Sequence, residues 1–311
     1  MPFSGLREEK ADCERCYALD TDKIGRKDWF FRVDFVDSVS VTGVQTCALP
    51  ISEDSTVRED CGIPCRIRLQ KENHMFRIVH RKALKPTVIQ IEVEAPLVAK
   101  KAKPGQFIIL RVDENGERIP LTIAGANPEA GTVKIIFQVV GATTELLRRK
   151  TEGMYIQDFV GPLGVATHTE GIRSVCVVGG GAGCAIAMPV AEEFHRLGAK
   201  VTSIIGFRSK DLLILEDEFR ACSDRLEVMT DDGSYARHGN VTVPLKEMLE
   251  AGETFDEIIT IGPLVMMKFV TLTAKPFGVP VTVSMNPIMI DGTGMCGGCR
   301  LTLGQGDKRG T

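Results

Sequence analysis

One stretch in the second half of the chain constrains the fold most strongly. The apolar run "SVCVVGG" (174–180) has the composition of a buried strand and leads into a glycine turn. The run "CAIAMPVAEEFHRLG" (184–198) follows with the spacing of a helix, and "KVTSIIGF" (200–207) is again typical of a strand. Because a strand–helix–strand unit joins parallel strands, the sequence predicts a parallel sheet with a nucleotide site at the carboxyl ends of its strands.

Further segments continue this alternating pattern up to residue 285. Strands are predicted at 225–230, 255–262 and 280–285, and a helix is predicted at 263–275. We therefore expect one α/β domain over residues 169–285.

The preceding part of the chain, residues 75–168, has a different pattern. Its short β-rich runs are "FRIVHRKAL", "TVIQIEVEA", "QFIILRV", "RIPLTIA" and "TVKIIFQVV", and turn residues separate them. One short helix is predicted at 143–150, and "GPLG" (161–164) closes the segment. Evenly spaced short strands favour an antiparallel barrel or sandwich.

Composition excludes several classes of protein. The chain has 311 residues, a hydrophobic fraction of 43% and a net charge of −3, which suits a globular protein of about two domains. Nothing in this balance indicates nucleic acid as a partner, and no apolar run is long enough to span a bilayer. Without a secretory signal we expect a cytoplasmic protein, whose ten cysteines serve as metal ligands or buried thiols.

The region before Met75 is expected to lie outside the native protein. The run "VTGVQTCALPI" (41–51) resembles the translation of a sequencing-library adapter. The codons of Lys71 and Glu72 can form a purine-rich ribosome-binding sequence, and their distance from Met75 suits a bacterial start codon. We therefore expect residues 1–74 to be a non-native extension. The alternative is a small zinc module built from two cysteine pairs, which are Cys13 with Cys16 and Cys61 with Cys65.

Two segments of the α/β domain are candidates for dinucleotide binding. Glycines that follow a strand let backbone N–H groups approach a diphosphate at a helix N-terminus. This turn contains Gly179, Gly180, Gly181 and Gly183. The spacing departs from the usual fingerprint, so a tight turn without a ligand stays open as an alternative. The second segment follows the third strand and contains Asp231, Asp232 and Gly233, for which a simple polar turn is the alternative.

The barrel carries two candidate flavin motifs. In "RIPLT" the side chain of Arg118 can neutralise a diphosphate and Thr122 can hydrogen-bond a flavin ring, with Pro120 and Leu121 between them. In "GATT" the residues Gly141, Thr143 and Thr144 open the short helix, whose N–H groups can also meet phosphate. Taken alone, a strand arginine is more often a solvated charge.

The C-terminal stretch "DGTGMCGGCR" contains the candidate metal ligands. Plant-type two-iron clusters use the pattern C-x4-C-x2-C followed by a distant cysteine. Here Asp291, Cys296 and Cys299 occupy that frame, and no cysteine follows. We expect the sequence to be cut before a fourth ligand. A zinc knuckle or a turn with free thiols is the alternative.

The order of these motifs resembles the ferredoxin reductase superfamily. The C-terminal cluster frame resembles the electron-transfer subunit of dihydroorotate dehydrogenase B. It is still more similar to the small subunit of the NADH-dependent reduced ferredoxin:NADP oxidoreductase family, also described as sulfide dehydrogenase-like, in which aspartate stands at the first cluster position. The resemblance extends from Met75 to Arg300.

The resemblance implies a fold and three cofactors. It implies an antiparallel FAD-binding barrel (75–168), a parallel-sheet NAD-binding domain (169–285) and a C-terminal [2Fe-2S] segment (286–311). It also implies that NADH passes hydride to FAD, and that the electrons then cross the cluster to a larger flavoprotein or iron–sulfur subunit, and through it to ferredoxin. No acid–base catalytic residue is needed.

Three alternatives remain open. Arg208, after the second strand, would suit the 2′-phosphate of NADP, although the similar subunits use NADH. The partner is a dihydroorotate dehydrogenase if the chain serves pyrimidine biosynthesis. The third alternative is a non-catalytic nucleotide-binding module with a structural zinc knuckle. A visible spectrum distinguishes it from an electron-transfer subunit, because flavin and iron–sulfur clusters absorb visible light and zinc does not.

Overall fold

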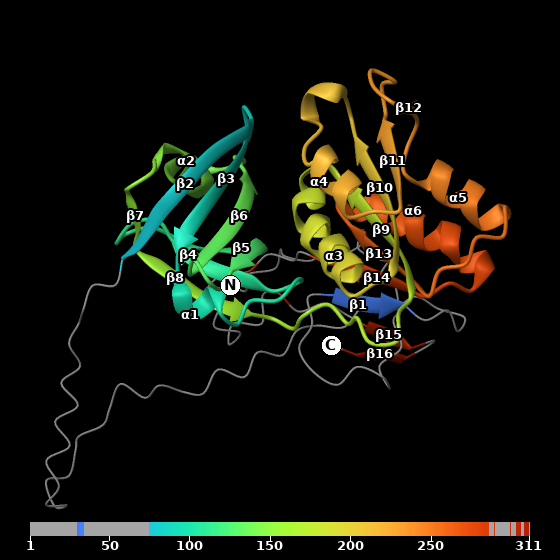
Figure 1. Ribbon diagram of the computed structural model, residues 1–311, viewed down its shortest axis with the longest axis horizontal. Helices are drawn as coiled ribbons and strands as arrows, with labels where there is room; N and C mark the ends of the chain where they lie inside the picture. The colour runs from blue at the N-terminus through green and yellow to red at the C-terminus, as the bar shows by residue number, and fades with distance from the viewer. Residues whose placement is uncertain are drawn as a thin grey trace, which may run out of the picture.

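The structure is a computed structural model that describes two halves lying side by side (Figure 1). It describes residues 75–285, residues 289 and 299, and the backbone alone of 30–33, 303–305 and 308–310. One half is built from antiparallel strands and the other from a parallel sheet with helices on its two faces. The antiparallel barrel and the parallel-sheet α/β domain predicted from the sequence are confirmed.

The antiparallel half is a near-closed barrel of seven strands in the order β7-β2-β3-β6-β5-β4-β8. Its strands are β2 (Phe76–Lys85), β3 (Val88–Glu94), β4 (Phe107–Arg111), β5 (Arg118–Asn127), β6 (Thr132–Gln138), β7 (Tyr155–Ile156) and β8 (Asp158–Leu163). Two helices accompany them, α1 (Pro96–Ala99) and α2 (Ala142–Arg149). The alternating pattern of β3 places Ile89, Ile91 and Val93 in the barrel core, as a strand with one buried face requires.

The α/β half contains a seven-stranded sheet in the order β1-β14-β13-β9-β10-β11-β12. Its strands are β1 (Phe30–Val33), β9 (Ser174–Gly180), β10 (Lys200–Phe207), β11 (Arg225–Thr230), β12 (Arg237–His238), β13 (Glu257–Ile261) and β14 (Val281–Ser284). All neighbours are parallel except β1 and β14. The chain also forms an antiparallel pair of short strands, β15 (Leu303–Gln305) and β16 (Lys308–Gly310).

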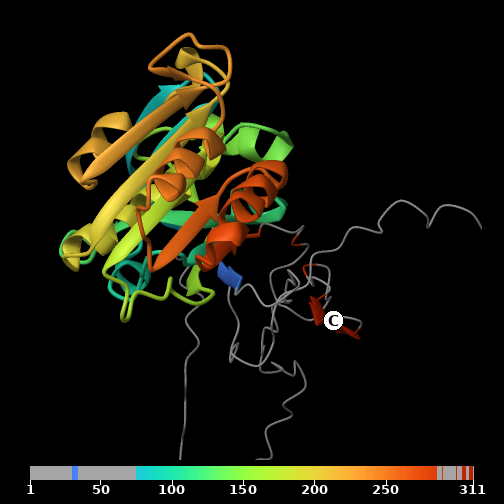
Figure 2. The same cartoon turned by 90° about the vertical axis from the view of Figure 1, so that its right-hand side faces the viewer.

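Helices cover the two faces of this sheet. They are α3 (Cys184–Arg196), α4 (Glu216–Ala221), α5 (Thr242–Glu250) and α6 (Leu264–Ala274), with 3-10 turns η1 (Gly181–Gly183), η2 (Lys210–Leu212) and η3 (Lys275–Phe277). Buried side chains of α3 and α4 belong to one hydrophobic cluster, and those of α5 and α6 belong to another. Figure 2 shows α5 and α6 in front of the sheet, on the side away from the barrel.

The strand β1 comes from the part of the chain that was expected to be an extension. It pairs antiparallel with the edge strand β14, with Phe30 opposite Ser284 and Val33 opposite Val281. Through this pairing, the backbone of four residues of the N-terminal region adds an edge strand to the sheet. The domain boundaries, including the separate status of residues 1–74, stay a prediction.

The two halves are joined by a shared hydrophobic core. Barrel residues Val88, Phe107 and Ile109 belong to the same buried cluster as the α3 residues Val190 and Phe194. A continuous apolar contact of this kind holds two domains in one relative arrangement better than a polar interface does. Residues from the two halves are therefore held at opposite walls of the space between them.

Candidate functional site

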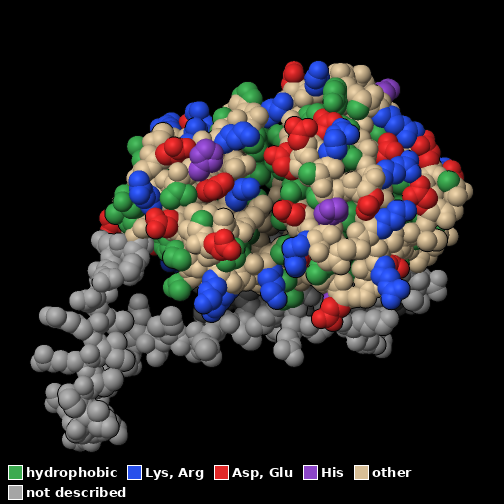
Figure 3. Space-filling view, viewed as in Figure 1, with side chains coloured by type: hydrophobic (Ala, Val, Ile, Leu, Met, Phe, Trp, Pro, Cys, Tyr) green, Lys and Arg blue, Asp and Glu red, His purple; other side chains and the backbone are tan. Residues whose placement is uncertain are grey.

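A cleft of about 950 Å³ lies between the barrel and the sheet. The space-filling view shows the surface hollowed between the two halves (Figure 3). In the sheet, the central strand β9 has β13 on one side and β10 on the other, so the chain leaves β9 at the point where the strand order reverses. The crevice at such a switch point is where open α/β sheets bind ligands.

The glycine turn after β9 forms one wall of the cleft. Gly181 has a φ of +54°, a conformation that favours glycine, and a Cβ at this position would meet no atom within 4 Å. At Gly183 the reason for glycine is close packing, since a Cβ there would lie 2.5 Å from the backbone oxygen of Ile261. The turn therefore leaves open space above its N–H groups while it packs against the turn after β13. This geometry suits a diphosphate at the start of α3.

The predicted site residues divide into three groups. Those that line the cleft are Pro120, Leu121, Thr122, Gly180, Gly181, Gly183, Arg208 and Asp231. Those near the start of α2 are Arg118, Gly141, Thr143 and Thr144. The remaining ones, Gly179, Asp232 and Gly233, do not line the cleft, and a Cβ at Gly179 would lie 2.9 Å from the sulfur of Cys184.

The strand β5 connects the first two groups. It begins at Arg118 and passes through Pro120, Leu121 and Thr122, which line the cleft. Proline is tolerated at this place because β5 pairs with β6 only from Ile123 onward. Four residues along a strand span roughly 13 Å. One strand therefore places a basic side chain at one end and a threonine hydroxyl near the sheet domain.

The guanidinium of Arg118 is half exposed and weakly held. Its Nη2 lies 3.8 Å from Oδ2 of Asp158, and the same carboxylate oxygen accepts a shorter hydrogen bond, 2.6 Å, from Nε of Arg111. Because Arg111 is the closer partner of Asp158, Arg118 keeps most of its donors available. A diphosphate is a ligand that suits such a group.

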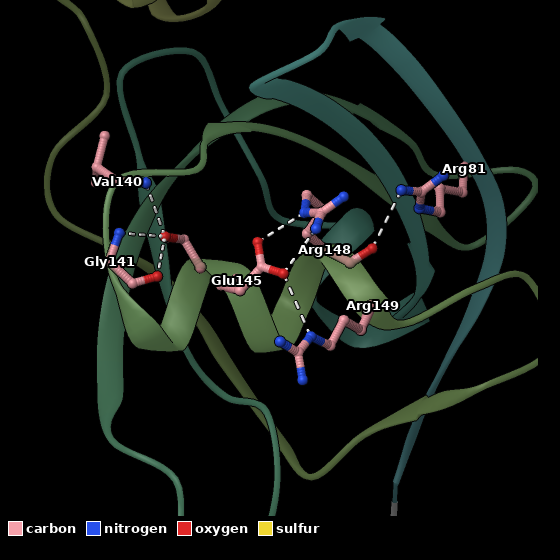
Figure 4. Close-up of polar contacts among 7 residues, drawn as sticks. Arg81, Val140, Gly141, Glu145, Arg148 and Arg149 are labelled. Atoms are coloured by element: carbon pink, nitrogen blue, oxygen red, sulfur yellow. Dashed lines mark hydrogen bonds and ion pairs between the residues drawn. The ribbon is translucent and has the colours of Figure 1, made fainter.

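The start of α2 is capped by the hydroxyl of one of its own threonines (Figure 4). The hydroxyl of Thr144 accepts hydrogen bonds from the N–H groups of Val140 and Gly141, at 3.0 Å each. The hydroxyl of Thr143 donates to Oε2 of Glu117 at 2.9 Å, which ties the beginning of β5 to the beginning of α2. Both hydroxyls are thus engaged within the protein. What remains for a phosphate is the first-turn N–H groups and the open space at Gly141, where a Cβ would meet nothing within 4 Å.

Further along α2, Glu145 accepts hydrogen bonds from two arginines. Nε and Nη2 of Arg148 each lie 2.7 Å from a different oxygen of Glu145, and Nε of Arg149 lies at 3.3 Å (Figure 4). These contacts, with that of Arg148 first, lower the pKa of Glu145 to about 2. The backbone oxygen of Arg148 accepts a bond from Arg81 at 3.1 Å, which joins α2 to β2. These contacts stabilise α2 and fix its position against β2.

Several cleft residues were not among the predicted ones. The end of β6 contributes Ile136, Phe137 and Gln138, and the turn after β13 contributes Gly262 and Pro263. The segment that enters α5 contributes Asn240, Val241 and Thr242, and α6 contributes Val265, Met266 and Phe269. The glycine–proline pair at the carboxyl end of a predicted strand was a usable signal, because parallel strands end at the same edge of a sheet.

The structure describes only one of the three predicted cluster ligands. Asp291 and Cys296 lie outside the described residues, whereas Cys299 is described and its side chain is 5% exposed. In the described part of the chain, no group of three or more histidine, cysteine or acidic residues could hold a metal ion. Two sheet-domain cysteines, Cys176 and Cys184, are completely buried, and burial raises the pKa of each thiol. They are packing residues.

Among the residues that the structure describes, no helix is both long and apolar enough to cross a bilayer.

Comparison with known proteins defines the relatives of the chain. No protein-family model matches it. A Clostridium beijerinckii protein described as an uncharacterized protein in the adh 3′ region is 48% identical over 238 residues, which cover 74% of this chain and 80% of that protein. A Thermotoga maritima protein described as a homologue of the dihydroorotate dehydrogenase B (NAD+) electron-transfer subunit is 46% identical over 226 residues, which cover 73% of this chain and 79% of that protein.

Solved structures give the same picture. A chain of the NADH-dependent reduced ferredoxin-NADP oxidoreductase has a TM-score of 0.68 and 45% identity, and the match covers 72% of this chain and 81% of that one. A ferredoxin reductase of a carbazole 1,9a-dioxygenase has a TM-score of 0.58 at 21% identity, which shows a shared fold.

The barrel, the parallel sheet and the cleft between them define a protein of the ferredoxin reductase-like class. With 46% identity over 79% of the length of its Thermotoga relative, the chain belongs to the family of dihydroorotate dehydrogenase B electron-transfer subunits and their homologues. It is therefore an electron-transfer subunit of an oxidoreductase and acts together with a partner subunit. The prediction of an oxidoreductase subunit is confirmed.

Proposed function

We propose that this subunit carries electrons between NAD(H), FAD and a [2Fe-2S] cluster, and passes them to or from a partner subunit. One observation carries the proposal: the glycine turn after β9 and the residues Pro120, Leu121 and Thr122 of β5 line one cleft. A nucleotide held at the first and a flavin ring held at the second share a single space. When bound, FAD would supply the change between two-electron and one-electron chemistry.

The barrel residues hold the flavin in this proposal. Arg118 neutralises the diphosphate, together with the first-turn N–H groups of α2 next to Gly141. Thr122 hydrogen-bonds the edge of the flavin ring, which lies against Pro120 and Leu121. The fit rests on the exposed guanidinium of Arg118 and on the open space at Gly141. Glu117 is an exposed carboxylate that faces the same turn through Thr143, so it must move aside when phosphate binds there.

The sheet residues hold the dinucleotide. The N–H groups of Gly181 and Gly183 at the start of α3 face the diphosphate, and the carboxyl ends of β10 and β11 receive the adenosine. The side chains of Val265 and Phe269 on α6 line the cleft and are 64% and 53% exposed. Once a nucleotide covers them, these apolar groups would restrict water in the cleft. Barrel and sheet residues line the same cleft, so they would hold the nucleotide and the flavin close to each other.

The cluster and the partner complete the proposed electron path. Asp291, Cys296 and Cys299 are the proposed ligands, and a fourth ligand is not assigned. The larger flavoprotein or iron–sulfur subunit of a ferredoxin:NADP oxidoreductase is the proposed partner, with ferredoxin reached through it. The 45% identity to a chain of such an oxidoreductase supports this choice. The name of the Thermotoga relative favours a second candidate, a dihydroorotate dehydrogenase catalytic subunit.

An anaerobic titration tests the proposal. The full chain is loaded with FAD, and its visible spectrum is recorded while NADH is added. We expect the flavin absorption to bleach at about one equivalent of NADH. The variant Thr122→Val should reduce the rate of flavin reduction by NADH with little loss of folded protein. A chain that retains no FAD, or whose bound FAD stays oxidised in excess NADH and NADPH, contradicts the proposal.

The partner is tested separately. Both candidate partner subunits, taken from one organism, are mixed with the full chain, and complex formation is measured by size-exclusion chromatography. Co-elution with the ferredoxin:NADP oxidoreductase large subunit alone supports the proposed partner. Co-elution with the dihydroorotate dehydrogenase subunit alone supports the second candidate.

A further inference from the structure

Two opposite charges face the cleft at the end that lies beyond β10 and β11. These strands are parallel and in register up to Phe207 opposite Thr230. The ladder continues past the strands, because the N–H of Asp231 donates to the oxygen of Phe207 at 3.0 Å and that of Asp232 donates to the oxygen of Arg208 at 3.1 Å. Arg208 and Asp231 are therefore neighbours, and both side chains are exposed and line the cleft.

The segments that carry these two residues are held in place by hydrogen bonds. The N–H of Lys210 donates to the hydroxyl of Ser234 at 2.8 Å, which joins the loop after β10 to the loop after β11. The hydroxyl of Thr230 donates to the oxygen of Tyr235 at 2.6 Å, and the phenol of Tyr235 donates to Glu216 at 3.2 Å. The positions of Arg208 and Asp231 thus follow from a connected set of contacts on both loops.

Neither charge is satisfied by the other. Within residues 75–285, neither the guanidinium of Arg208 nor the carboxylate of Asp231 forms a hydrogen bond or an ion pair. The neighbouring Asp232 differs, because its carboxylate accepts a bond from the N–H of Ser234 at 2.9 Å and does not line the cleft. Two free charges of opposite sign at one end of a ligand cleft can contact two parts of one ligand.

The position of the pair indicates which part of a dinucleotide it meets. In the proposed function, a diphosphate at the glycine turn would lie beyond β9, and the nicotinamide would lie toward the barrel. The adenosine then extends over β10 and β11, where Leu212 and Ile214 add apolar surface to the cleft. The adenosine ribose carries a 2′-hydroxyl in NAD and a 2′-phosphate in NADP, so this end of the cleft distinguishes the two nucleotides.

We propose that Asp231 is the specificity-determining residue that makes the cleft select NADH over NADPH. Its carboxylate accepts hydrogen bonds from the ribose hydroxyls and repels a 2′-phosphate, which Arg208 alone would attract. The proposal rests on the proposed function, since it assigns a role within the same nucleotide site. It also explains how a chain with an arginine after the second strand can use NADH.

The expected effect follows from Coulomb's law. A carboxylate and a doubly charged phosphate about 6 Å apart in a water-like dielectric repel each other enough to change binding roughly tenfold. Added salt weakens this effect, because both groups are exposed. Removing the charge of Asp231 should therefore tighten binding of NADP+ about tenfold and leave or weaken binding of NAD+.

Equilibrium binding tests the assignment. Dissociation constants of NAD+ and NADP+ are measured by isothermal titration calorimetry at low salt for the FAD-loaded wild type, Asp231→Asn, Arg208→Gln and the double variant. The control is Asp211→Asn, which removes the same charge from η2, outside the cleft lining. Urea unfolding midpoints establish that all variants are folded.

Each outcome has a defined meaning. A wild-type preference for NAD+, a roughly tenfold gain of NADP+ affinity in Asp231→Asn, and loss of that gain in the double variant support the proposal. An unchanged preference in Asp231→Asn, or an equal shift in Asp211→Asn, overturns it while the proposed function stands. Failure of the folded wild type to bind either nucleotide overturns both.

Discussion

Replacing Gly183 by alanine tests how the glycine turn is packed. Gly183 has an ordinary helical φ of −61°, so alanine meets no backbone strain. Its Cβ, however, would lie 2.5 Å from the oxygen of Ile261 and 2.8 Å from Cα of Gly262. Both are backbone atoms, at the end of β13 and in the turn that follows it, so no side-chain rotation relieves the contact, and α3 must move away from β13.

The size of the effect follows from two opposing contributions. Overpacking of this kind costs about 1–3 kcal/mol. The smaller conformational entropy of alanine in the unfolded chain offsets about 0.4–1 kcal/mol. The difference spans about 0–2.6 kcal/mol, so we expect a net loss of roughly 1.3 kcal/mol in the free energy of unfolding. Because the displaced turn lines the cleft, the affinity for NAD+ should fall as well.

Urea unfolding followed by circular dichroism measures this loss, with Gly141→Ala as the matched control. Gly141 has an extended φ of −159°, and a Cβ there would meet no atom within 4 Å. The control should change the free energy of unfolding by at most about 1 kcal/mol, the usual size of an N-cap effect. If Gly183→Ala is as stable as the wild type and binds NAD+ equally well, the close approach of α3 to the turn after β13 is not a real constraint.

Three further predictions concern the barrel and the N-terminal region. Arg118→Ala should lower FAD affinity by about one to two orders of magnitude in equilibrium dialysis, since a charge-assisted contact contributes roughly 1.5–3 kcal/mol; unchanged FAD retention would remove Arg118 from the site. A chain that starts at Met75 should fold and bind FAD like the full chain, and a large loss of either property would show that residues 1–74 belong to the domain. The contact with Arg148 lowers the folded-state pKa of Glu145 to about 2, from an ordinary value of 4.5. The ionised Glu145 therefore stabilises the folded state above pH 4.5, and this stabilisation is lost as the pH falls toward 2. Glu145→Gln should therefore show a weaker dependence of unfolding free energy on pH in that window, and an acid limb identical to that of the wild type would argue against the contact.

The architecture was accessible from the sequence because its signals are local and repeated. The period-two runs of the barrel and the strand–glycine–helix–strand order of the sheet follow from short-range physics. The helix predicted at 184–198 is α3 (Cys184–Arg196), and the strand predicted at 200–207 is β10 (Lys200–Phe207). The expectation that the "RIPLT" and "GGGAG" segments lie near each other came from the order of the motifs and from the family resemblance.

Side-chain partners between distant segments were not accessible in this way. Nothing in the "GATT" pattern indicates that the hydroxyl of Thr143 donates to Glu117, which lies 26 residues earlier in the chain. The contribution of α6 to the cleft was also missed. Its sequence is apolar on all sides, so periodicity cannot tell that Val270 is buried while Val265 and Phe269 are exposed and line the cleft. These features depend on how whole elements pack.

The central claim is that one cleft between the two halves holds both FAD and NAD(H). A crystal structure of the FAD-loaded chain soaked with NAD+ tests it most directly. We predict density for the flavin ring beside Pro120–Thr122, with its diphosphate near Arg118 and Gly141, and density for the NAD+ diphosphate at Gly181 and Gly183. Density for the flavin ring or for the NAD+ diphosphate outside this cleft, in a chain that binds both in solution, would contradict the account.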